Sequence, residues 1–340
     1  MYETVLVASR GPVARSVVRT CQRLGVRAVT VHSEGDADAL HVVEADDSVL
    51  IGPAPPEQSY LDPQRVVEAA RQAGAQAVHP GAGALAVDPA AARAVLDAGL
   101  AWVGAAPEVL EAASAVPGGG SGRTVTVLVL APADAPPVAL CDLERVDALE
   151  PSAVLAAPAP GLGADERRAV LAAAAAAVAE LGVRGTAAVQ VRTGPSPRVT
   201  GVRCALPVEH PVAALLADVD LVEQQLRAAA SEPADRRTAA PVVAAALSLR
   251  VYALGLGAEG ARIARWAEPA GVRVDSGYRE GDVVPAWYDP LLATVTVVGA
   301  DAGAVVSQAR VALQELVVEG PRTNLPQLRS LLADPSFAAA

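Results

Sequence analysis

Short apolar runs alternate with helical spacing through the first hundred residues of the chain, which predicts strands separated by helices. Strands are expected at residues 3–9, 27–33, 48–51, 75–80 and 100–104, and helices at residues 13–24, 64–73 and 89–98. This alternation is typical of an α/β domain with an open parallel sheet and right-handed crossovers. Such sheets bind ligands at the carboxyl ends of their strands, which here carry Ser9-Arg10-Gly11, His32-Ser33 and His79-Pro80-Gly81.

The pattern changes after residue 114. Residues 115–123 form a Gly-rich connector, and residues 124–131 alternate as a strand does. The pattern then predicts a long helix at 165–181, a hairpin around Gly194-Pro195-Ser196, one helix at 211–229 and a linker from residue 231. Further strands are expected at 245–253, 271–275 and 293–298, and helices at 302–316 and 325–332. Together with the length of 340 residues, this predicts two or three domains.

Composition narrows the function classes. The net charge of −11 and the lack of a basic cluster argue against nucleic acid and anionic membranes as partners. All 27 basic residues are arginine, so the chain has no lysine. Three cysteines without a CxxC pair argue against a disulfide framework or a zinc site. With no signal peptide at the N-terminus and no apolar run long enough to span a bilayer, we expect a cytoplasmic protein.

Several segments, taken in order, resemble biotin carboxylases, the ATP-grasp subunit of acetyl-, propionyl- and pyruvate-type carboxylases. The resemblance is carried by residues 10–61, HPGAG from His79, APAPGL from Ala157, VEHPV from Val208, DLVEQQLRAA from Asp220, and residues 272–292 and 319–337. It implies an α/β protein with a Rossmann-like (pre-ATP-grasp) N-terminal domain at 1–114 and a remnant ATP-grasp domain at 115–230. A linker at 231–243 and a C-terminal α+β domain at 244–340 would complete the chain.

The resemblance also implies a mobile lid before residue 124, where this chain has only residues 117–122, PGGGSG. This segment could be a phosphate-binding loop or a flexible splice between two domains. We favour the splice, because Gly- and Ser-rich sequence is typical of linkers. The ATP-grasp domain is therefore expected to lack its lid.

The family reaction activates bicarbonate with ATP and then carboxylates biotin. It needs lysines on the phosphates, two carboxylates on Mg²⁺ and a cationic clamp on bicarbonate. Aligned on the motifs, none of these groups is present. The lysines fall at Val116, Ser152 and Thr294, the metal carboxylates at Ala188 (Gln190 if the register slips) and Gly201, the catalytic arginine at Ala205 and the bicarbonate glutamine at Pro207. Arg203, two residues before Ala205, is a candidate substitute on the same face of a strand.

Two positions match functional residues of the family: Glu209 the general base and Arg273 the arginine that stabilises the biotin enolate. They indicate either a residual anion or biotin site or, as we favour, a structural Glu–Arg pair between the second and third domains. A residual cleft is expected around Ser9, His79, Gly81 and Arg203. His79 and His210 are expected to be packed, hydrogen-bonded residues, and Asp36, Asp38 and His41 are not expected to bind a metal.

Arg10, Gly11, Arg15 and Arg19 lie in a segment that contributes to the dimer face in the family. A row of arginines on a helix is usually solvated, so a homodimer stays an open alternative.

Three functions remain. The favoured one is a non-catalytic biotin carboxylase-like protein, with no bound cofactor or metal, that partners carboxylase subunits or a biotin carrier protein. The second is an active biotin carboxylase or other ligase whose rebuilt site binds ATP and Mg²⁺. The third is a small-ligand binding module.

Overall fold

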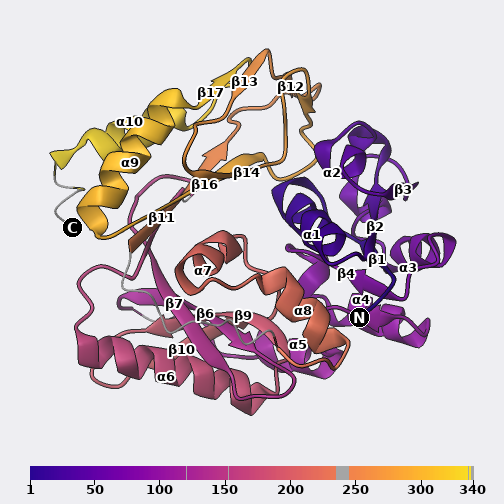
Figure 1. Ribbon diagram of the computed structural model, residues 1–340, viewed down its shortest axis with the longest axis horizontal. Helices are drawn as coiled ribbons and strands as arrows, with labels where there is room; N and C mark the ends of the chain where they lie inside the picture. Colours follow the sequence, from indigo (N-terminus) through magenta and orange to yellow (C-terminus); the bar gives the residue numbers. More distant parts are fainter. Residues whose placement is uncertain (120, 152, 235–244, 336, 338–340) are drawn as a thin grey trace.

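The computed structural model of the chain describes residues 1–119, 121–151, 153–234, 245–335 and 337. Its first part is a five-stranded parallel sheet in the order β3-β2-β1-β4-β5 (Figure 1). The strands are β1 (Thr4–Val7), β2 (Arg27–His32), β3 (Asp47–Leu50), β4 (Ala77–His79) and β5 (Ala101–Trp102). The helices around it are α1 (Gly11–Arg23), α2 (Leu40–Val43), α3 (Pro63–Gln72), α4 (Pro89–Asp97) and α5 (Pro107–Ser114). The predicted open parallel sheet is confirmed.

Helix α1 shows why this part folds as its pattern predicts. Val13, Val17 and Cys21 recur at helical spacing and are buried against the sheet. Pro12 in the first turn is already constrained to a helical φ, and Arg23 in the last turn suits the negative end of the helix dipole. The start of α1 follows directly on the end of β1, so residues 9–11 lie at the carboxyl edge of the sheet.

The second sheet has eight antiparallel strands in the order β10-β9-β6-β7-β8-β11-β16-β14. Its strands are β6 (Thr124–Ala131), β7 (Val138–Arg145), β8 (Val154–Ala157), β9 (Gly185–Arg192), β10 (Arg198–Arg203), β11 (Ala245–Tyr252), β14 (Arg273–Ser276) and β16 (Leu291–Gly299). Because β8 pairs with β11, the sheet continues across the expected linker. Residues 235–243 of that linker and residue 244 lie outside the described residues.

Both faces of this sheet are covered. On β6, Val127 and Val129 pack in one apolar cluster with helix α6 (Ala164–Leu181), whereas Leu128 and Leu130 pack in another with Val212 and its neighbours. The first of these clusters also contains Leu6 of the parallel sheet, so the two sheets share a core. The predicted hairpin of β9 and β10 is confirmed.

The helix predicted over residues 211–229 is two helices, α7 (His210–Ala217) and α8 (Leu221–Ala229). Asp218 has a left-handed backbone with φ of 49°, which ends α7. Asp220 then caps α8 by accepting the N–H groups of Val222 and Glu223. The apolar spacing carries across the break because both helices pack on the same core, so the pattern alone does not reveal it.

Strands β7 and β8 were not predicted. The apolar run of β7 is interrupted by Asp142, which is buried and accepts hydrogen bonds from Ala159 N–H and from Arg167. A buried polar residue satisfied by distant partners hides a strand from pattern analysis.

The last part places helices α9 (Ala302–Glu315) and α10 (Leu325–Ala333) near β11 and β16 (Figure 1). Two small sheets join β12 (Ala261–Arg262) to β15 (Val283–Val284) and β13 (Arg265–Ala267) to β17 (Val317–Glu319). Of the helices in the described residues, none is long and apolar enough to cross a bilayer.

Candidate functional site

A cavity of about 620 Å³ opens where the three parts of the chain meet. The carboxyl edge of the parallel sheet, the β9–β10 hairpin with the loop after it, and the segment around residue 288 all contribute to its walls. Ser9, Arg10, Ala188, Arg203, Pro207, Glu209, Arg250 and Trp287 are among the lining residues. Five of the sequence-predicted site positions therefore meet here: Ser9, Ala188, Arg203, Pro207 and Glu209.

The edge of the parallel sheet is held by a close backbone contact. Gly81 has φ of +65°, and a Cβ on it would overlap the side chain of Ser9. Its N–H donates to Nδ1 of His79 at 3.0 Å. His79 is fully buried, and burial lowers its pKa to about 4 although the Gln225 amide beside it acts in the opposite direction. His79 and Gly81 thus support the wall from behind, while Ser9 and Arg203 of the expected cleft line it.

The β9–β10 hairpin carries the positions expected for metal carboxylates. In its register Ala188 lies opposite Arg203, and Gly201 lies opposite Gln190. The guanidinium of Arg203 donates to the backbone carbonyl of Gly83 at 3.1 Å, reaching across to the parallel-sheet part. A cation thus stands across the ladder from Ala188. Among the described residues, no group of three or more His, Cys, Asp or Glu side chains is placed to hold a metal ion.

The loop after β10 places two more predicted positions. Strand β10 ends at Arg203, so Ala205 lies beyond it and is buried, which removes the expected alternation between the two residues. Pro207 lines the cavity, and its carbonyl lies 3.0 Å from Nδ1 of the buried His210. Burial also lowers the pKa of His210.

Glu209 follows this loop and forms an ion pair with Arg250 of β11. The side chains are 14% and 20% exposed, so the pair is largely removed from solvent. The expected pairing of Glu209 with Arg273 is wrong. Arg273 instead holds Asp275 through two hydrogen bonds of 2.7 and 3.0 Å. The alternation of β14 places these two residues on one face, which favours the local partner over the distant one.

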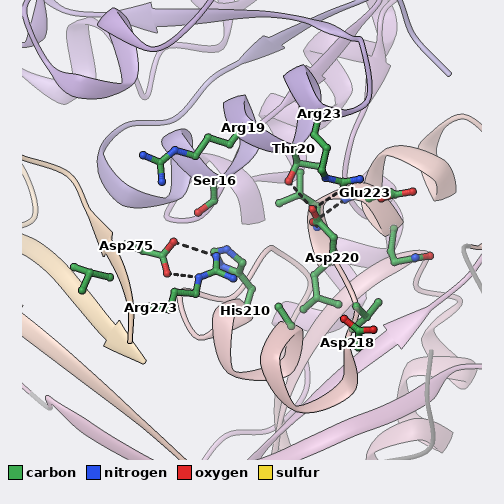
Figure 2. A pocket seen from close by; sticks show the side chains of 16 residues that line it. Ser16, Arg19, Thr20, Arg23, His210, Asp218, Asp220, Glu223, Arg273 and Asp275 are labelled. Carbon is green, nitrogen blue, oxygen red and sulfur yellow. Dashed lines mark hydrogen bonds and ion pairs between the residues drawn. The ribbon is translucent and has the colours of Figure 1, made fainter. Parts of the chain in front are cut away.

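Arg273 belongs to a second cavity of about 460 Å³, shown in Figure 2. There Asp220 accepts a hydrogen bond from Thr20 at 2.7 Å, and Arg23 bridges Asp220 and Glu223. Glu209 and Arg273, the two residues that match family positions, therefore line different cavities.

The expected lysine positions do not converge on the first cavity. Val116 lies just after α5, and Thr294 is buried in β16 opposite Arg250. Neither residue lines the cavity. Ser152 lies outside the described residues.

A network of aromatic and charged residues closes one side of the first cavity. Arg10 binds Asp36 through two hydrogen bonds of 2.8 and 3.0 Å, and Tyr60 donates to the same carboxylate at 2.7 Å. From the last part of the chain, Tyr278 lies 3.2 Å from Arg10, and the ring of Tyr288 lies 4.1 Å from its guanidinium carbon. Burial opposes both charges, but the paired contact outweighs it: the pKa of Asp36 is lowered and that of Arg10 is raised.

The arginine row on α1 is not the solvated face that its pattern indicates. Arg15 is buried, and it binds Glu44 at 2.9 and 2.5 Å and the hydroxyl of Ser276 at 2.8 Å. Arg19, which also contacts Glu44, and Arg23 at the end of the helix are each about half exposed. Arg15 thus joins the parallel-sheet part to β14.

The sequence pattern does not mark Arg250 or Trp287 as site residues. No local signal marks Arg250, because its partner Glu209 lies in a different part of the chain. The rarity of tryptophan could have drawn attention to Trp287, because the chain has three tryptophans. In the structure Trp287 is 54% exposed and lines the cavity.

Three family models match the chain in order. They are the biotin carboxylase N-terminal domain at residues 1–110, the carbamoyl-phosphate synthase L chain ATP-binding domain at 121–237 and the biotin carboxylase C-terminal domain at 256–340. A biotin carboxylase of Halalkalibacterium halodurans is 28% identical over 435 residues, covering all of this chain and 96% of that protein. The biotin carboxylase of Pseudomonas aeruginosa is 29% identical over 434 residues, covering 99% of this chain and 96% of that protein.

Solved structures agree with the fold. The urea carboxylase of Kluyveromyces lactis matches 99% of this chain with a TM-score of 0.91 and 27% identity. A single-chain, multi-domain long-chain acyl-CoA carboxylase matches 99% with a TM-score of 0.88 and 32% identity. The match covers 32% and 39% of those two proteins, so this chain corresponds to a part of each.

Proposed function

We propose that this chain, which belongs to the biotin carboxylase family, is a non-catalytic member that serves a carboxylase system as a structural or regulatory partner. The observation that carries the proposal is the β9–β10 hairpin. Where the resemblance places two metal carboxylates, Ala188 and Gly201 stand, and Arg203 lies opposite Ala188. A guanidinium repels Mg²⁺, which needs carboxylate oxygens to offset its charge.

The phosphate contacts support the same conclusion. The chain has no lysine to supply the compact ammonium that the family uses. Helix α5 ends at Ser114 and β6 begins at Thr124, and this short connection supports the proposal that the chain carries no lid there. The alignments with the two biotin carboxylases run over 435 and 434 residues, more than the 340 residues of this chain. Those proteins therefore contain residues that have no counterpart here. We therefore propose a lid-less ATP-grasp domain at 115–230, between domains at 1–114 and 244–340.

The ion pair of Glu209 also supports a non-catalytic role. Its carboxylate matches the family's general base, but Arg250 engages it across the interface between two parts of the chain. We propose that this pair, together with the loss of the arginine and glutamine at Ala205 and Pro207, leaves bicarbonate without a clamp or a free base.

One observation favours an active enzyme instead. The family model that matches residues 121–237 is described as an ATP-binding domain. On this alternative, arginines such as Arg203 would replace the missing lysines on the phosphates.

Calorimetric titration with MgATP, repeated with bicarbonate and biotin present, separates the two functions. We expect no binding heat and no bicarbonate-dependent ATP hydrolysis, with the Pseudomonas aeruginosa biotin carboxylase as the positive control. Binding of MgATP at micromolar concentration would contradict the proposal, and bicarbonate-dependent ATP hydrolysis would then establish the alternative.

The partner is tested separately. Relatives of this chain include the propionyl-CoA carboxylase alpha chain of Homo sapiens and the single-chain acyl-CoA carboxylase described above. We propose a cytoplasmic role beside such subunits and expect co-elution with a carboxyltransferase or biotin carrier subunit from the same organism. Separate elution at micromolar concentration of both proteins would count against the partnership without affecting the titration result.

A further inference from the structure

Among the described residues that line the first cavity, Arg203 is the one arginine for which no carboxylate partner is found, and the Asp289 carboxylate on the same lining accepts the N–H of Leu291. Arg10 is paired with Asp36 and Arg250 with Glu209. Arg203 lines the same cavity, and within the part of the chain that the structure describes its recorded contact is the neutral carbonyl of Gly83. A guanidinium has five N–H donors, so most of those on Arg203 are free for another acceptor.

The residue across the ladder from this cation leaves space for a ligand. Ala188 pairs with Arg203 in the hairpin register and also lines the cavity. Because its side chain is a methyl group, nothing charged or bulky projects from that position toward Arg203. The planar fork of a guanidinium binds carboxylates through two parallel hydrogen bonds.

The other walls are largely apolar. Ala82, Ala84, Leu85, Leu206 and Val208 line the cavity from two parts of the chain. Trp287, which is 54% exposed, lies on its border, where an indole ring can cover a bound apolar group. The volume of about 620 Å³ falls within the usual range for small-molecule sites.

We propose that this cavity binds a compact organic monocarboxylate, with its carboxylate on Arg203 and its apolar body against the alanine and leucine wall. One unpaired guanidinium suits one negative charge, and the Asp289 carboxylate elsewhere on the lining disfavours a polyphosphate. The apolar walls suit a hydrocarbon or aromatic body and not a hydrated inorganic anion. This inference goes beyond the proposed function, because it is independent of whether the chain has a carboxylase partner.

Phenylacetate and its uncharged analogue phenylacetamide are the probes for this site. Full-length protein is titrated with each up to millimolar concentration, by calorimetry and by tryptophan fluorescence. We expect phenylacetate to bind and phenylacetamide to bind about tenfold or more weakly, because the amide lacks the charge that Arg203 recognises. Equal binding of the two probes, or no binding of phenylacetate, would overturn the proposal.

Variants locate the site. Arg203→Met is expected to weaken phenylacetate binding by about tenfold or more, because it keeps the length of the side chain but removes the charge. Arg198→Met is the matched control, since Arg198 is also exposed on β10 but does not line the cavity. Ala188→Glu should have the same effect as Arg203→Met, because a carboxylate opposite Arg203 would occupy its donors.

Trp287→Phe provides a readout that does not depend on the charge. We expect it to remove the fluorescence change while the binding heat remains. If Arg203→Met and Ala188→Glu both bind phenylacetate as tightly as the unchanged protein does, the carboxylate is not on Arg203 and the proposal is wrong.

Discussion

Two arginines of helix α1 contact the same glutamate but differ in how far they are buried, and this difference should set how much each contact stabilises the fold. Arg15 and Arg19 lie one helical turn apart on α1 and both contact Glu44, but the Arg15 side chain is 9% exposed and that of Arg19 is 52% exposed. Arg15 also bonds Ser276 of β14. A buried charge that loses its partner remains desolvated, whereas an exposed one is solvated by water.

Replacing each of these arginines with methionine tests the difference. We expect Arg15→Met to lower the free energy of unfolding by about 2 to 3 kcal/mol, and Arg19→Met by less than about 1 kcal/mol. Urea unfolding at neutral pH measures both values. Equal losses in the two variants would show that burial of Arg15 does not govern the strength of its contacts.

At the scale of elements, the turn after β4 is set by how closely it approaches β1. Gly81 lies at the carboxyl edge of the parallel sheet, with its φ in the left-handed region and no room for a Cβ beside Ser9. Gly74, after α3, has nearly the same φ of +64° but open space around the position of a Cβ. Comparing the two glycines therefore distinguishes the cost of a left-handed backbone from the cost of a steric overlap.

Alanine substitution at these two positions is expected to have unequal costs. Gly74→Ala should lower the free energy of unfolding by about 1 kcal/mol, the cost of a left-handed backbone for a residue with a Cβ. Gly81→Ala should cost about 3 kcal/mol or more, because the added methyl also displaces Ser9. Denaturant unfolding gives both numbers, and a loss at Gly81 no larger than at Gly74 would contradict the steric account.

At the scale of the whole molecule, the three parts share their interior. The eight-stranded sheet passes from β8 to β11, and one apolar cluster contains Leu6 of the first sheet together with Val127 of the second. Two histidines are sealed within this interior: burial lowers the pKa of both His41 and His79 to about 4. Each therefore stays neutral in the folded chain at pH values where the unfolded chain is already protonated.

The stability of the molecule should accordingly fall on acidification. The contribution of each histidine is fully present above the unfolded pKa of about 6.5 and is lost progressively as the pH falls toward about 4. Each accounts for up to about 1.4 kcal/mol of unfolding free energy per pH unit in this window. Urea unfolding across the window should show a shallower slope for His41→Gln than for the unchanged protein; an unchanged slope would exclude His41 as a source.

Much of this fold follows from local pattern. The apolar spacing of α1 and the alternation of strands and helices predict the parallel sheet, because each element must bury one face. The break between α7 and α8 and the strand β7 do not follow from it. Asp218 and Asp142 carry those features, and each depends on packing or on partners far away in the sequence.

Some features of the candidate site also follow from the sequence alone, whereas others depend on the tertiary structure. The absence of lysine and the small residues at Ala188 and Gly201 are properties of the sequence, and they limit the chemistry in any arrangement of the chain. Only the tertiary structure decided that Glu209 meets Arg250, that Arg273 faces a separate cavity and that Arg203 lacks a carboxylate partner among the described residues. The reason is physical. Spacing along the sequence assigns a side chain to one face of its own helix or strand. Which of the many arginines pairs with a given carboxylate depends on how separate elements pack.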